Sequence, residues 1–322
     1  MAMAKKKNDS TPVQATVTEK RFSWQFPIVK LRYWWFAISL LIIIPGIISL
    51  FMHGINQGID FKGGSVFDIN FSKQVSQGQI STALESIKLG DSQVQMTDAT
   101  RSLIKTKALD ETERDTLIKT LEEKVAPFDH SSLKEDKVGP TIGNELKWDA
   151  ITALAIAAVG MIIYLSIRFE FLYGISAIIA IIHDVLVVLG LFSIFQWEID
   201  SSFVAAILTV VGYSINDTVV IFDRIRENSE KLKRGDSYEE MVERSVWQTM
   251  GRSIYTVVTV LIMLFAIFLL GGESTRIFSL AMLIGVFSGA YSSIFNASQI
   301  LVEFKLWQER RTKNIRLGKS RA

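Results

Sequence analysis

Ionisable side chains lie in three of the long apolar stretches of this sequence. Asp184 follows His183 near the middle of one stretch. Asp217 follows Asn216 in a second, at the end of the run Gly-Tyr-Ser-Ile-Asn-Asp, and Arg252 opens a third. A charged side chain inside a bilayer is costly and usually faces a protein interior or a water path. We therefore predict an ion pathway formed by Asp217, Arg252, Asp184 and Asn216, with protons or sodium as the ion.

Reversible protonation of a carboxylate is the chemistry that this pattern favours. Burial favours the neutral form of an acid, and a nearby guanidinium favours the charged form. A carboxylate whose arginine partner moves away can therefore take up and release a proton. At the rise of an α-helix, Asp184 lies about 13 Å and Asp217 about 8 Å or more from the same membrane surface. The two carboxylates are therefore expected to share one internal polar region, with Arg252 near that surface.

Each of these residues also has a purely structural interpretation. Asp217 or Asp184 can form a fixed ion pair or a hydrogen bond with a neighbouring helix, and Arg252 can extend from the end of its span to the headgroups. His183 fits a hydrogen-bonding neighbour better than a proton relay. A solvated charge cluster is expected where the fourth stretch ends, at Asp223, Arg224, Arg226 and Glu227.

Composition excludes several other kinds of chemistry. The chain has no cysteine, which rules out disulfides, thiolate nucleophiles and cysteine metal sites. Its three histidines, His53, His130 and His183, are scattered without metal-ligand or catalytic-triad spacing. We therefore predict no enzyme activity, no metal and no cofactor. The formal net charge of +2 is too small to argue for nucleic acid as a partner.

Six apolar stretches come close to the roughly 20 residues that a helix needs to cross the hydrocarbon core. Hydrophobic residues make up 49% of the 322-residue chain, and the charged residues are concentrated elsewhere. Basic residues cluster in the N-terminal part, after the fourth stretch and in the C-terminal part, which predicts that these parts are cytoplasmic. The stretches are 33–52, 148–167, 175–195, 202–222, 254–270 and 278–302.

These stretches divide the chain into parts that we expect on different sides of the cytoplasmic membrane, with lipid around the helices. The polar segment 224–252 is expected to lie as a helix along the cytoplasmic surface, with Ser237 as its cap and Glu240 three residues later. The predicted parts are a cytoplasmic basic arm (1–32), a first transmembrane helix (33–52), an extracytoplasmic α+β domain (53–147), a five-helix membrane region (148–304) and a cytoplasmic basic tail (305–322).

The segment 53–147 has the pattern of a folded soluble domain. Residues 66–71 alternate between apolar and polar, as a half-buried strand does, and residues 110–125 carry an apolar stripe at helical spacing. A further helix is expected at 79–89 and short strands at 92–96, 103–108 and 132–138. The order β-α-β-β-α-β predicts a ferredoxin-like domain, inserted into an α-helical membrane bundle of six transmembrane helices.

Two glycine-containing motifs flank this domain. Gly58-Ile59-Asp60-Phe61-Lys62-Gly63-Gly64 superficially resembles a phosphate-binding loop, but no strand is predicted before it and no helix after it. We interpret it as a tight turn into the first strand. Val138-Gly139-Pro140 is interpreted as the return of the chain toward the second span.

The last apolar stretch has small residues at four-residue spacing. Such faces let helix backbones approach closely. Both a sliding contact in a moving bundle and ordinary static packing fit the pattern. The residues are Gly285, Gly289 and Ser293, with Ser288, Ser292 and Asn296 beside them.

Taken together, these motifs resemble the SecF family, the smaller membrane subunits of the bacterial SecDF protein-export complex. The resemblance covers about residues 31–306 and depends on the order of the motifs as well as on their residues. This sequence departs from many family members in its longer basic arm at the N-terminus. Besides the two glycine motifs, His183-Asp184 and the run that ends at Asp217, it rests on Arg168-Phe169-Glu170, Asp223-Arg224-Ile225-Arg226-Glu227-Asn228 and Arg252-Ser253.

The family belongs to the resistance-nodulation-division superfamily of ion-driven transporters. The resemblance implies a half-transporter that pairs with SecD, associates with the SecYEG channel and uses the proton gradient to assist export of an unfolded polypeptide. YajC and YidC are further partners that it suggests. The proton-path residues of the family match Asp217 and Arg252. The alternative functions are an ion-driven exporter of small molecules or lipids, and a passive assembly factor of the translocon.

Overall fold

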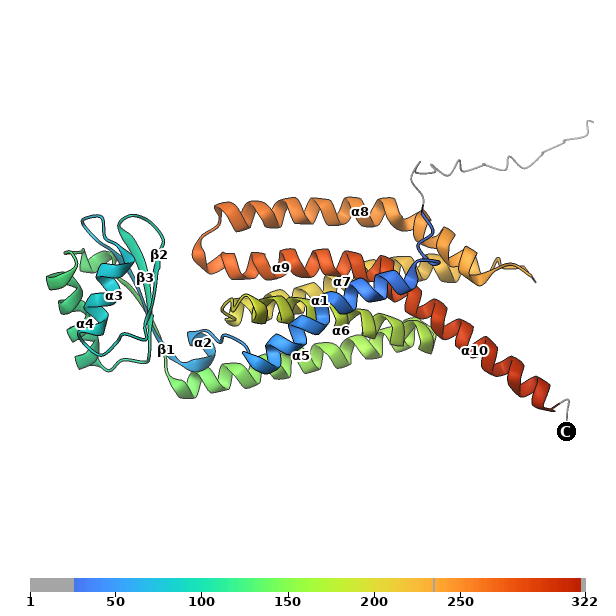
Figure 1. Cartoon of the computed structure of the whole chain (residues 1–322), viewed down its shortest axis with the longest axis horizontal. Helices are drawn as coiled ribbons and strands as arrows, with labels where there is room; N and C mark the ends of the chain where they lie inside the picture. Colours follow the sequence, from blue (N-terminus) through green and yellow to red (C-terminus); the bar gives the residue numbers. More distant parts are fainter. Residues whose placement is uncertain (1–25, 234, 320–322) are drawn as a thin grey trace, which may run out of the picture.

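The computed structural model describes residues 26–233 and 235–319 of the chain. Residues 1–25 of the predicted arm and residues 320–322 of the predicted tail lie outside this range, as does residue 234. The described chain has two parts (Figure 1). One is a bundle of long helices. The other, which we call the sheet domain (residues 64–138), is built on a four-stranded sheet and lies at one end of the bundle.

Within the described residues, six helices are long and apolar enough to cross a membrane. Each of the six predicted stretches lies within one of these helices, apart from residue 195, which lies one position beyond the end of its helix. The prediction of a helical membrane protein is therefore confirmed. The helices are α1 (Arg32–Met52), α5 (Pro140–Arg168), α6 (Phe171–Ile194), α7 (Ser201–Ser229), α8 (Tyr238–Leu270) and a last helix made of α9 (Glu273–Ser292), the π-helical turn η2 (Ser293–Ala297) and α10 (Ser298–Lys319).

The helix of the second span begins before the predicted apolar stretch. α5 starts at Pro140 with Gly139 as its N-cap, whereas the stretch begins at residue 148. Proline suits the first turn of a helix, where its missing N–H is not needed. The residues that follow it are polar and therefore looked like the end of the soluble domain. β4 (Lys134–Val138) ends directly before the helix, as the Val138-Gly139-Pro140 motif predicted.

The polar segment 224–252 is not a separate element. α7 continues to Ser229, and α8 runs from Tyr238 without a break into the fifth span. The predicted cap is present, because the Ser237 hydroxyl accepts a hydrogen bond of 3.4 Å from the Glu240 N–H. The described part of the predicted tail is also helical, as a continuation of the last span in α10.

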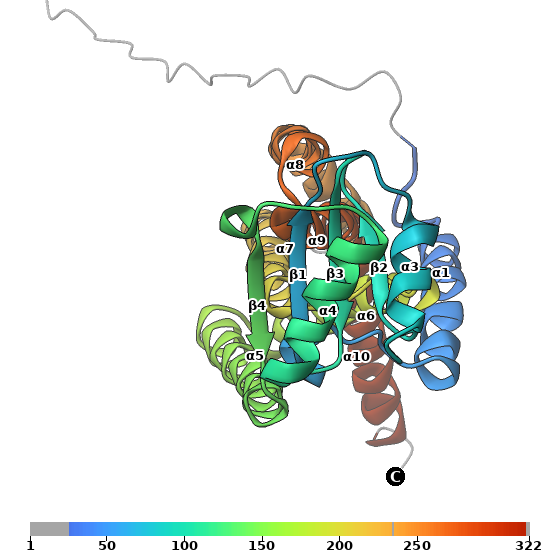
Figure 2. The same cartoon turned by 90° about the vertical axis from the view of Figure 1, so that its left-hand side faces the viewer.

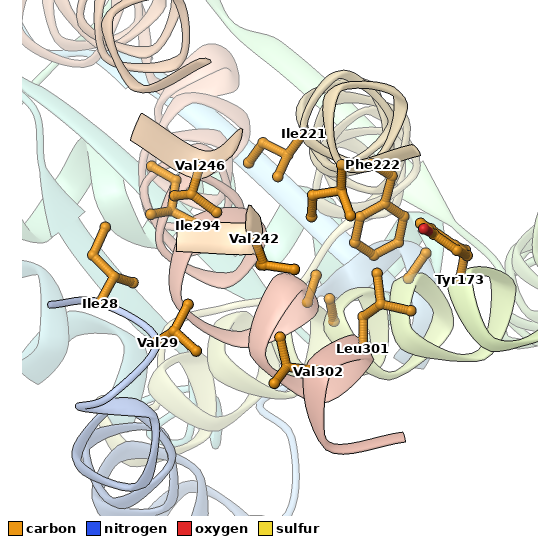
Figure 3. Close-up of a cluster of buried hydrophobic side chains, with 14 of the residues drawn as sticks. Ile28, Val29, Tyr173, Ile221, Phe222, Val242, Val246, Ile294, Leu301 and Val302 are labelled. Atoms are coloured by element: carbon orange, nitrogen blue, oxygen red, sulfur yellow. The ribbon is translucent and has the colours of Figure 1, made fainter. Parts of the chain in front are cut away.

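The end of the bundle away from the sheet domain has its own hydrophobic core (Figure 3). Ile28 and Val29 are buried there beside Val242 of α8. The Glu243 carboxylate holds this segment, since it accepts hydrogen bonds from the N–H groups of Ile28 (2.9 Å) and Val29 (2.7 Å). The end of the predicted cytoplasmic arm is therefore packed into the folded bundle at Ile28 and Val29.

The sheet domain follows the predicted order of strands and helices. Its two longer helices begin with capping boxes, in which Ser76 and Asp110 exchange hydrogen bonds with the residue three positions later. The strands lie in the order β2-β3-β1-β4, and every neighbouring pair is antiparallel. The elements are β1 (Gly64–Asn70), α3 (Gln77–Glu85), β2 (Gln93–Met96), β3 (Arg101–Thr106), α4 (Glu111–Lys124), a 3-10 turn η1 (His130–Ser132) and β4.

The two faces of the sheet have different surroundings. Phe67 and Ile69 of β1 are buried in a core that includes residues of α3 and α4, and both helices lie on the side of the sheet away from the bundle (Figures 1 and 2). Val66 and Asp68 alternate with them on the other face. That face borders a polar cleft of about 1230 Å³ between the sheet and the near end of the bundle.

Two close helix crossings hold the bundle around its polar interior. α1 and α6 cross where a Cβ added to Gly46 would lie 2.8 Å from the Gly190 Cα. α7 and α9 cross where a Cβ added to Gly285 would lie 2.2 Å from the Val210 Cγ2. Only small residues let helix axes approach this closely. The small-residue pattern of 278–302 is therefore a packed helix contact.

Candidate functional site

Asp217 lies on the buried side of α7, and one of its carboxylate oxygens has no partner. The residue is 8% exposed. Its Oδ1 accepts a hydrogen bond of 2.6 Å from the Ser253 hydroxyl on α8. Its Oδ2 is buried and has no hydrogen-bond partner among the described residues. A buried polar atom without a partner is costly, so the site is chemically incomplete within this part of the chain.

The side of α7 next to Asp217 is exposed and carries small and polar residues. Asn216, which the sequence placed in the pathway, is exposed, and so are Thr209 and Gly212. Their spacing of three and four residues puts them on one face of the helix. Rows of this kind are typical of surfaces where membrane helices pack against each other.

Arg252 belongs to a similar exposed row on α8, with Thr256 and Thr259. Arg252 directly precedes Ser253, whose hydroxyl donates to Asp217. The Asp217 carboxylate nevertheless has Ser253 as its sole hydrogen-bond partner among the described residues. The two predicted pathway residues are therefore near each other without forming a fixed ion pair.

Asp184 on α6 has the opposite environment. It is 1% exposed and accepts hydrogen bonds from the hydroxyls of Ser214 on α7 (2.6 Å), Ser288 (2.7 Å) and Ser292 (2.7 Å) on the last helix. His183 Nδ1 lies 3.0 Å from its Oδ1. Each oxygen has two partners, and the residue joins three helices. This geometry favours the structural interpretation of Asp184.

His183 extends this network to α1. Its Nε2 lies 3.1 Å from the Ser39 Oγ, and the Asn296 Nδ2 donates to the same oxygen at 2.9 Å. Both ring nitrogens of His183 therefore have partners. This agrees with the prediction that His183 is a hydrogen-bonding neighbour of Asp184.

The two carboxylates are adjacent but do not share their partners. Ser214 of α7 donates to Asp184, and Asp217, three residues later on the same helix, accepts from Ser253 of α8. The expected single polar region thus consists of two neighbouring sites, because Ser214 and Asp217, three residues apart, lie on one face of α7. A shift of this helix would affect both.

The charge cluster after the fourth span is solvated, as predicted. Asp223 lies 3.0 Å from Arg168 Nη2 and 3.3 Å from Arg226 Nη2. Arg224 pairs with Glu227 at 2.8 Å. All five side chains are at least 38% exposed. The described residues contain no group of three or more histidine or acidic side chains that could hold a metal ion.

The first glycine motif is more than a tight turn. It contains a short helix, α2 (Ile59–Lys62), which is too short to show a periodic pattern in the sequence. Asp60 in this helix accepts hydrogen bonds from the N–H (2.8 Å) and the hydroxyl of Ser201 at the start of α7. The motif therefore connects the sheet domain to α7.

The hydroxyl groups that hold both carboxylates were not predicted from the sequence. In the sequence, Ser253 stands out only as part of a motif, and Ser288 and Ser292 only as small residues. The available signal was a serine one helical turn from a membrane carboxylate, as at Ser214, or on a small-residue face of another span. Such serines can satisfy a buried acid without adding bulk.

Two family models match the chain. The model described as "Protein export membrane protein SecD/SecF, C-terminal" matches residues 117–307. The model described as "SecD/SecF GG Motif" matches residues 48–75, which include α2 and Asp60. The first match includes Asp184 and Asp217. The second includes Asp60, which connects the sheet domain to α7.

Individual relatives agree with these models. Protein translocase subunit SecF of Sebaldella termitidis is 38% identical to this chain over 85% of it and 90% of the relative. The same subunit of Acidaminococcus fermentans is 43% identical, over 87% of this chain and 98% of the relative. The crystal structure of SecDF, a translocon-associated membrane protein from Thermus thermophilus, matches 88% of this chain with a TM-score of 0.79 and 32% sequence identity. This chain spans 39% of that SecDF chain. The chain belongs to the SecF family of protein translocase subunits.

Proposed function

We propose that this chain is the SecF subunit of a SecDF complex and that it uses the proton gradient to assist protein translocation. The SecF relatives at 38% and 43% identity support the subunit role. The translocon-associated SecDF structure supports SecD as the partner and association with a translocon. SecYEG as the channel, YajC and YidC stay predictions from the resemblance.

In this proposal the chain crosses the cytoplasmic membrane six times, with both termini in the cytoplasm and the sheet domain outside. The basic residues of 1–32, 224–252 and 305–322 support this orientation. So does the position of α10, which lies at the end of the bundle away from the sheet domain. The strand order β2-β3-β1-β4, with both helices on one face, supports a ferredoxin-like plan for that domain.

The single observation that carries the proposal is the buried Oδ2 of Asp217, which has no partner among the described residues. A proton, or a donor from the partner subunit, would satisfy this atom. The exposed rows of α7 and α8, with Asn216 and Arg252, are the small polar surface that helices of SecD would cover. Asp217, Asn216 and Arg252 form the proposed proton pathway. Asp184 contributes by holding α6, α7 and α9 together beside it.

Energy coupling would begin with proton binding at Asp217. Removing a charge from a low-dielectric position can shift the packing of a bistable helix arrangement by several kcal/mol. One elementary charge that crosses 100 mV supplies about 2.3 kcal/mol, so roughly one proton per cycle is enough to bias such a shift. A movement of α7 would reach the sheet domain, which would hold the emerging unfolded polypeptide and limit its return. The polar cleft of about 1230 Å³ offers space for an extended chain.

Translocation into vesicles that contain SecYEG and the SecDF complex, under an imposed proton gradient, tests this proposal. Asp217→Asn removes the titratable group at nearly constant size. We expect translocation without a gradient to persist and stimulation by the gradient to be lost. Asp223→Asn is the matched control, because Asp223 lies on the same helix in the solvated cluster and should keep full stimulation.

The same assay separates the alternatives. Unchanged stimulation with Asp217→Asn would contradict the proposed coupling and would favour a passive assembly factor. Gradient-driven movement of a small molecule or lipid by the purified complex, lost with Asp217→Asn, would favour an exporter.

A further inference from the structure

The sheet domain is attached to the helical bundle at the loop between α6 and α7. The Gly58 N–H donates to the Ile199 carbonyl, and the Ile199 N–H donates to the Asn56 carbonyl, both at 2.8 Å. Lys105 on β3 forms an ion pair with Glu198 of the same loop. The main chain before α2 and a strand of the sheet thus both hold the loop that leads into α7.

Asp60 adds a direct contact with α7. Its Oδ2 accepts hydrogen bonds from the Ser201 N–H (2.8 Å) and from the Ser201 hydroxyl. α7 already has its own N-cap, because the Asp200 carboxylate accepts a hydrogen bond of 2.9 Å from the Phe203 N–H. Capping therefore does not require Asp60. A second carboxylate at a helix N-terminus is favourable, and here it ties α7 to the glycine motif.

The close contacts of α2 oppose its independent movement. Gly63, with a φ of 76°, leads straight into β1. A Cβ on Gly64 would lie 2.6 Å from the Thr106 carbonyl oxygen of β3. On the other side, a Cβ on Gly143 of α5 would lie 3.0 Å from the Phe61 carbonyl oxygen. Backbone contacts this close make α2 move together with the sheet and the start of α5.

We propose that Asp60 is a positioning residue that transmits movement of α7 to the sheet domain, with the Lys105–Glu198 ion pair as a second connection. The inference rests on the proposed function, since it requires α7 to move when Asp217 exchanges a proton. Ser201 and Asp217 are on one uninterrupted helix, about 24 Å apart along its axis. A shift of α7 at Asp217 therefore displaces Ser201, and Ser201 displaces Asp60.

A distance measurement in the complete SecDF complex tests this role. This chain has no cysteine, so in a complex with a cysteine-free SecD the spin labels attach only at Lys119→Cys on α4 and Ile262→Cys on α8, both of which are exposed. The distance between the labels is measured in the complex that has Asp217 and in the complex with Asp217→Asn, which mimics the protonated acid. We expect Asp217→Asn to shift the distance distribution, Asp60→Ala to abolish that shift, and Asp60→Asn, which keeps an acceptor oxygen for Ser201, to retain it.

A matched control variant is Asp129→Ala. Its carboxylate caps a turn inside the sheet domain by accepting from the Ser131 N–H at 2.9 Å, and the distance shift should be unaffected by its loss. If Asp60→Ala does not assemble, Glu198→Ala removes the second connection, because alanine leaves Lys105 no acceptor, and it should reduce the shift. A full shift with Asp60→Ala, or with Glu198→Ala in that case, would overturn the positioning role.

Translocation measurements distinguish this failure from failure of the proposed function. Asp60→Ala should lose stimulation by the gradient and keep gradient-independent translocation, with Asp60→Asn restoring stimulation. Full stimulation with Asp60→Ala would overturn the positioning role alone. An Asp217→Asn variant that neither shifts the distance nor loses stimulation would overturn the proposed function, and the coupling through Asp60 with it.

Discussion

The Ser253 hydroxyl on α8 donates a hydrogen bond of 2.6 Å to Asp217 on α7 and is the sole donor to that carboxylate among the described residues. Asp184 on α6 has four partners. One bundle thus contains a saturated and an unsaturated buried aspartate. The saturated one suits a structural role, and the unsaturated one suits a group that changes its state.

Replacement of Asp184 is expected to destabilise the bundle. Asp184→Asn puts an N–H₂ group where three serine hydroxyls and His183 need acceptors, and each buried group left without a partner costs about 1–3 kcal/mol. We expect a loss of roughly 2–4 kcal/mol in the free energy of unfolding, since part of the network can rearrange. Thermal unfolding of the purified protein in detergent measures it. Asp217→Asn should unfold at nearly the parental temperature, and equal losses in the two variants would contradict the distinction.

Loss of the Ser253 hydroxyl should impair coupling. Ser253→Ala leaves the Asp217 carboxylate without its donor, and a hydrogen bond to a charged group contributes about 1.5–3 kcal/mol. We expect gradient-stimulated translocation to fall by about tenfold or more, since 1.4 kcal/mol corresponds to a factor of ten. Ser279→Ala is the control, because this buried hydroxyl donates to main-chain carbonyls of its own helix, at Thr275 and Arg276. Equal stimulation in the two variants would argue against a role for Ser253.

The crossing of α7 and α9 should reject a single added methyl group. A Cβ at Gly285 would lie 2.2 Å from the Val210 Cγ2, and overpacking of this kind costs about 1–3 kcal/mol. Gly285→Ala should therefore lower the unfolding temperature. Val210→Ala in the same chain should restore part of the loss, because it removes the clashing methyl groups. A double variant less stable than Gly285→Ala alone would show that the crossing is not limited by this contact.

The sheet domain should lose stability in acid through Asp68. Arg101 donates to both carboxylate oxygens of Asp68, at 2.8 and 2.6 Å, and this hydrogen bonding holds the pKa of Asp68 below its ordinary value. With a lowered folded-state pKa, the stabilisation is fully present above the ordinary aspartate pKa of about 3.9 and is lost as the pH falls through the lowered value. Because Arg101 is 45% exposed, we expect about 1 kcal/mol or less.

Hydrogen exchange of the β1 amides in the full-length protein, corrected for intrinsic rates, measures this effect between about pH 6 and pH 3. Protection should decrease with acid in the parental protein and decrease less in Asp68→Asn. The same pH dependence in both proteins would exclude the Asp68–Arg101 pair as the cause.

The parts of the fold that depend on local periodicity were predictable. The spans follow from length and hydropathy, and β1 follows from the alternation of Phe67 and Ile69 with Val66 and Asp68. α2 is too short for any period. The start of α5 at Pro140 was hidden because the polar residues that follow it do not continue the apolar stretch of the span.

The candidate site was predictable only in its carboxylates. Asp184 and Asp217 stand out because charge is rare in apolar stretches. Their serine partners come from other helices, and those pairings depend on crossings such as Gly285 against Val210, which no local pattern determines. The contact between Asp60 and Ser201 joins residues 141 positions apart and is likewise a result of tertiary packing.

The central claim is that Asp217 exchanges a proton, and infrared difference spectroscopy of the complete SecDF complex in membranes between low and high pH tests it most directly. The C=O stretch of a protonated carboxylic acid is separate from the bands of a carboxylate. We predict a pH-dependent C=O band that disappears with Asp217→Asn and stays with Asp223→Asn. An identical C=O band with and without the Asp217 carboxyl group would contradict the claim.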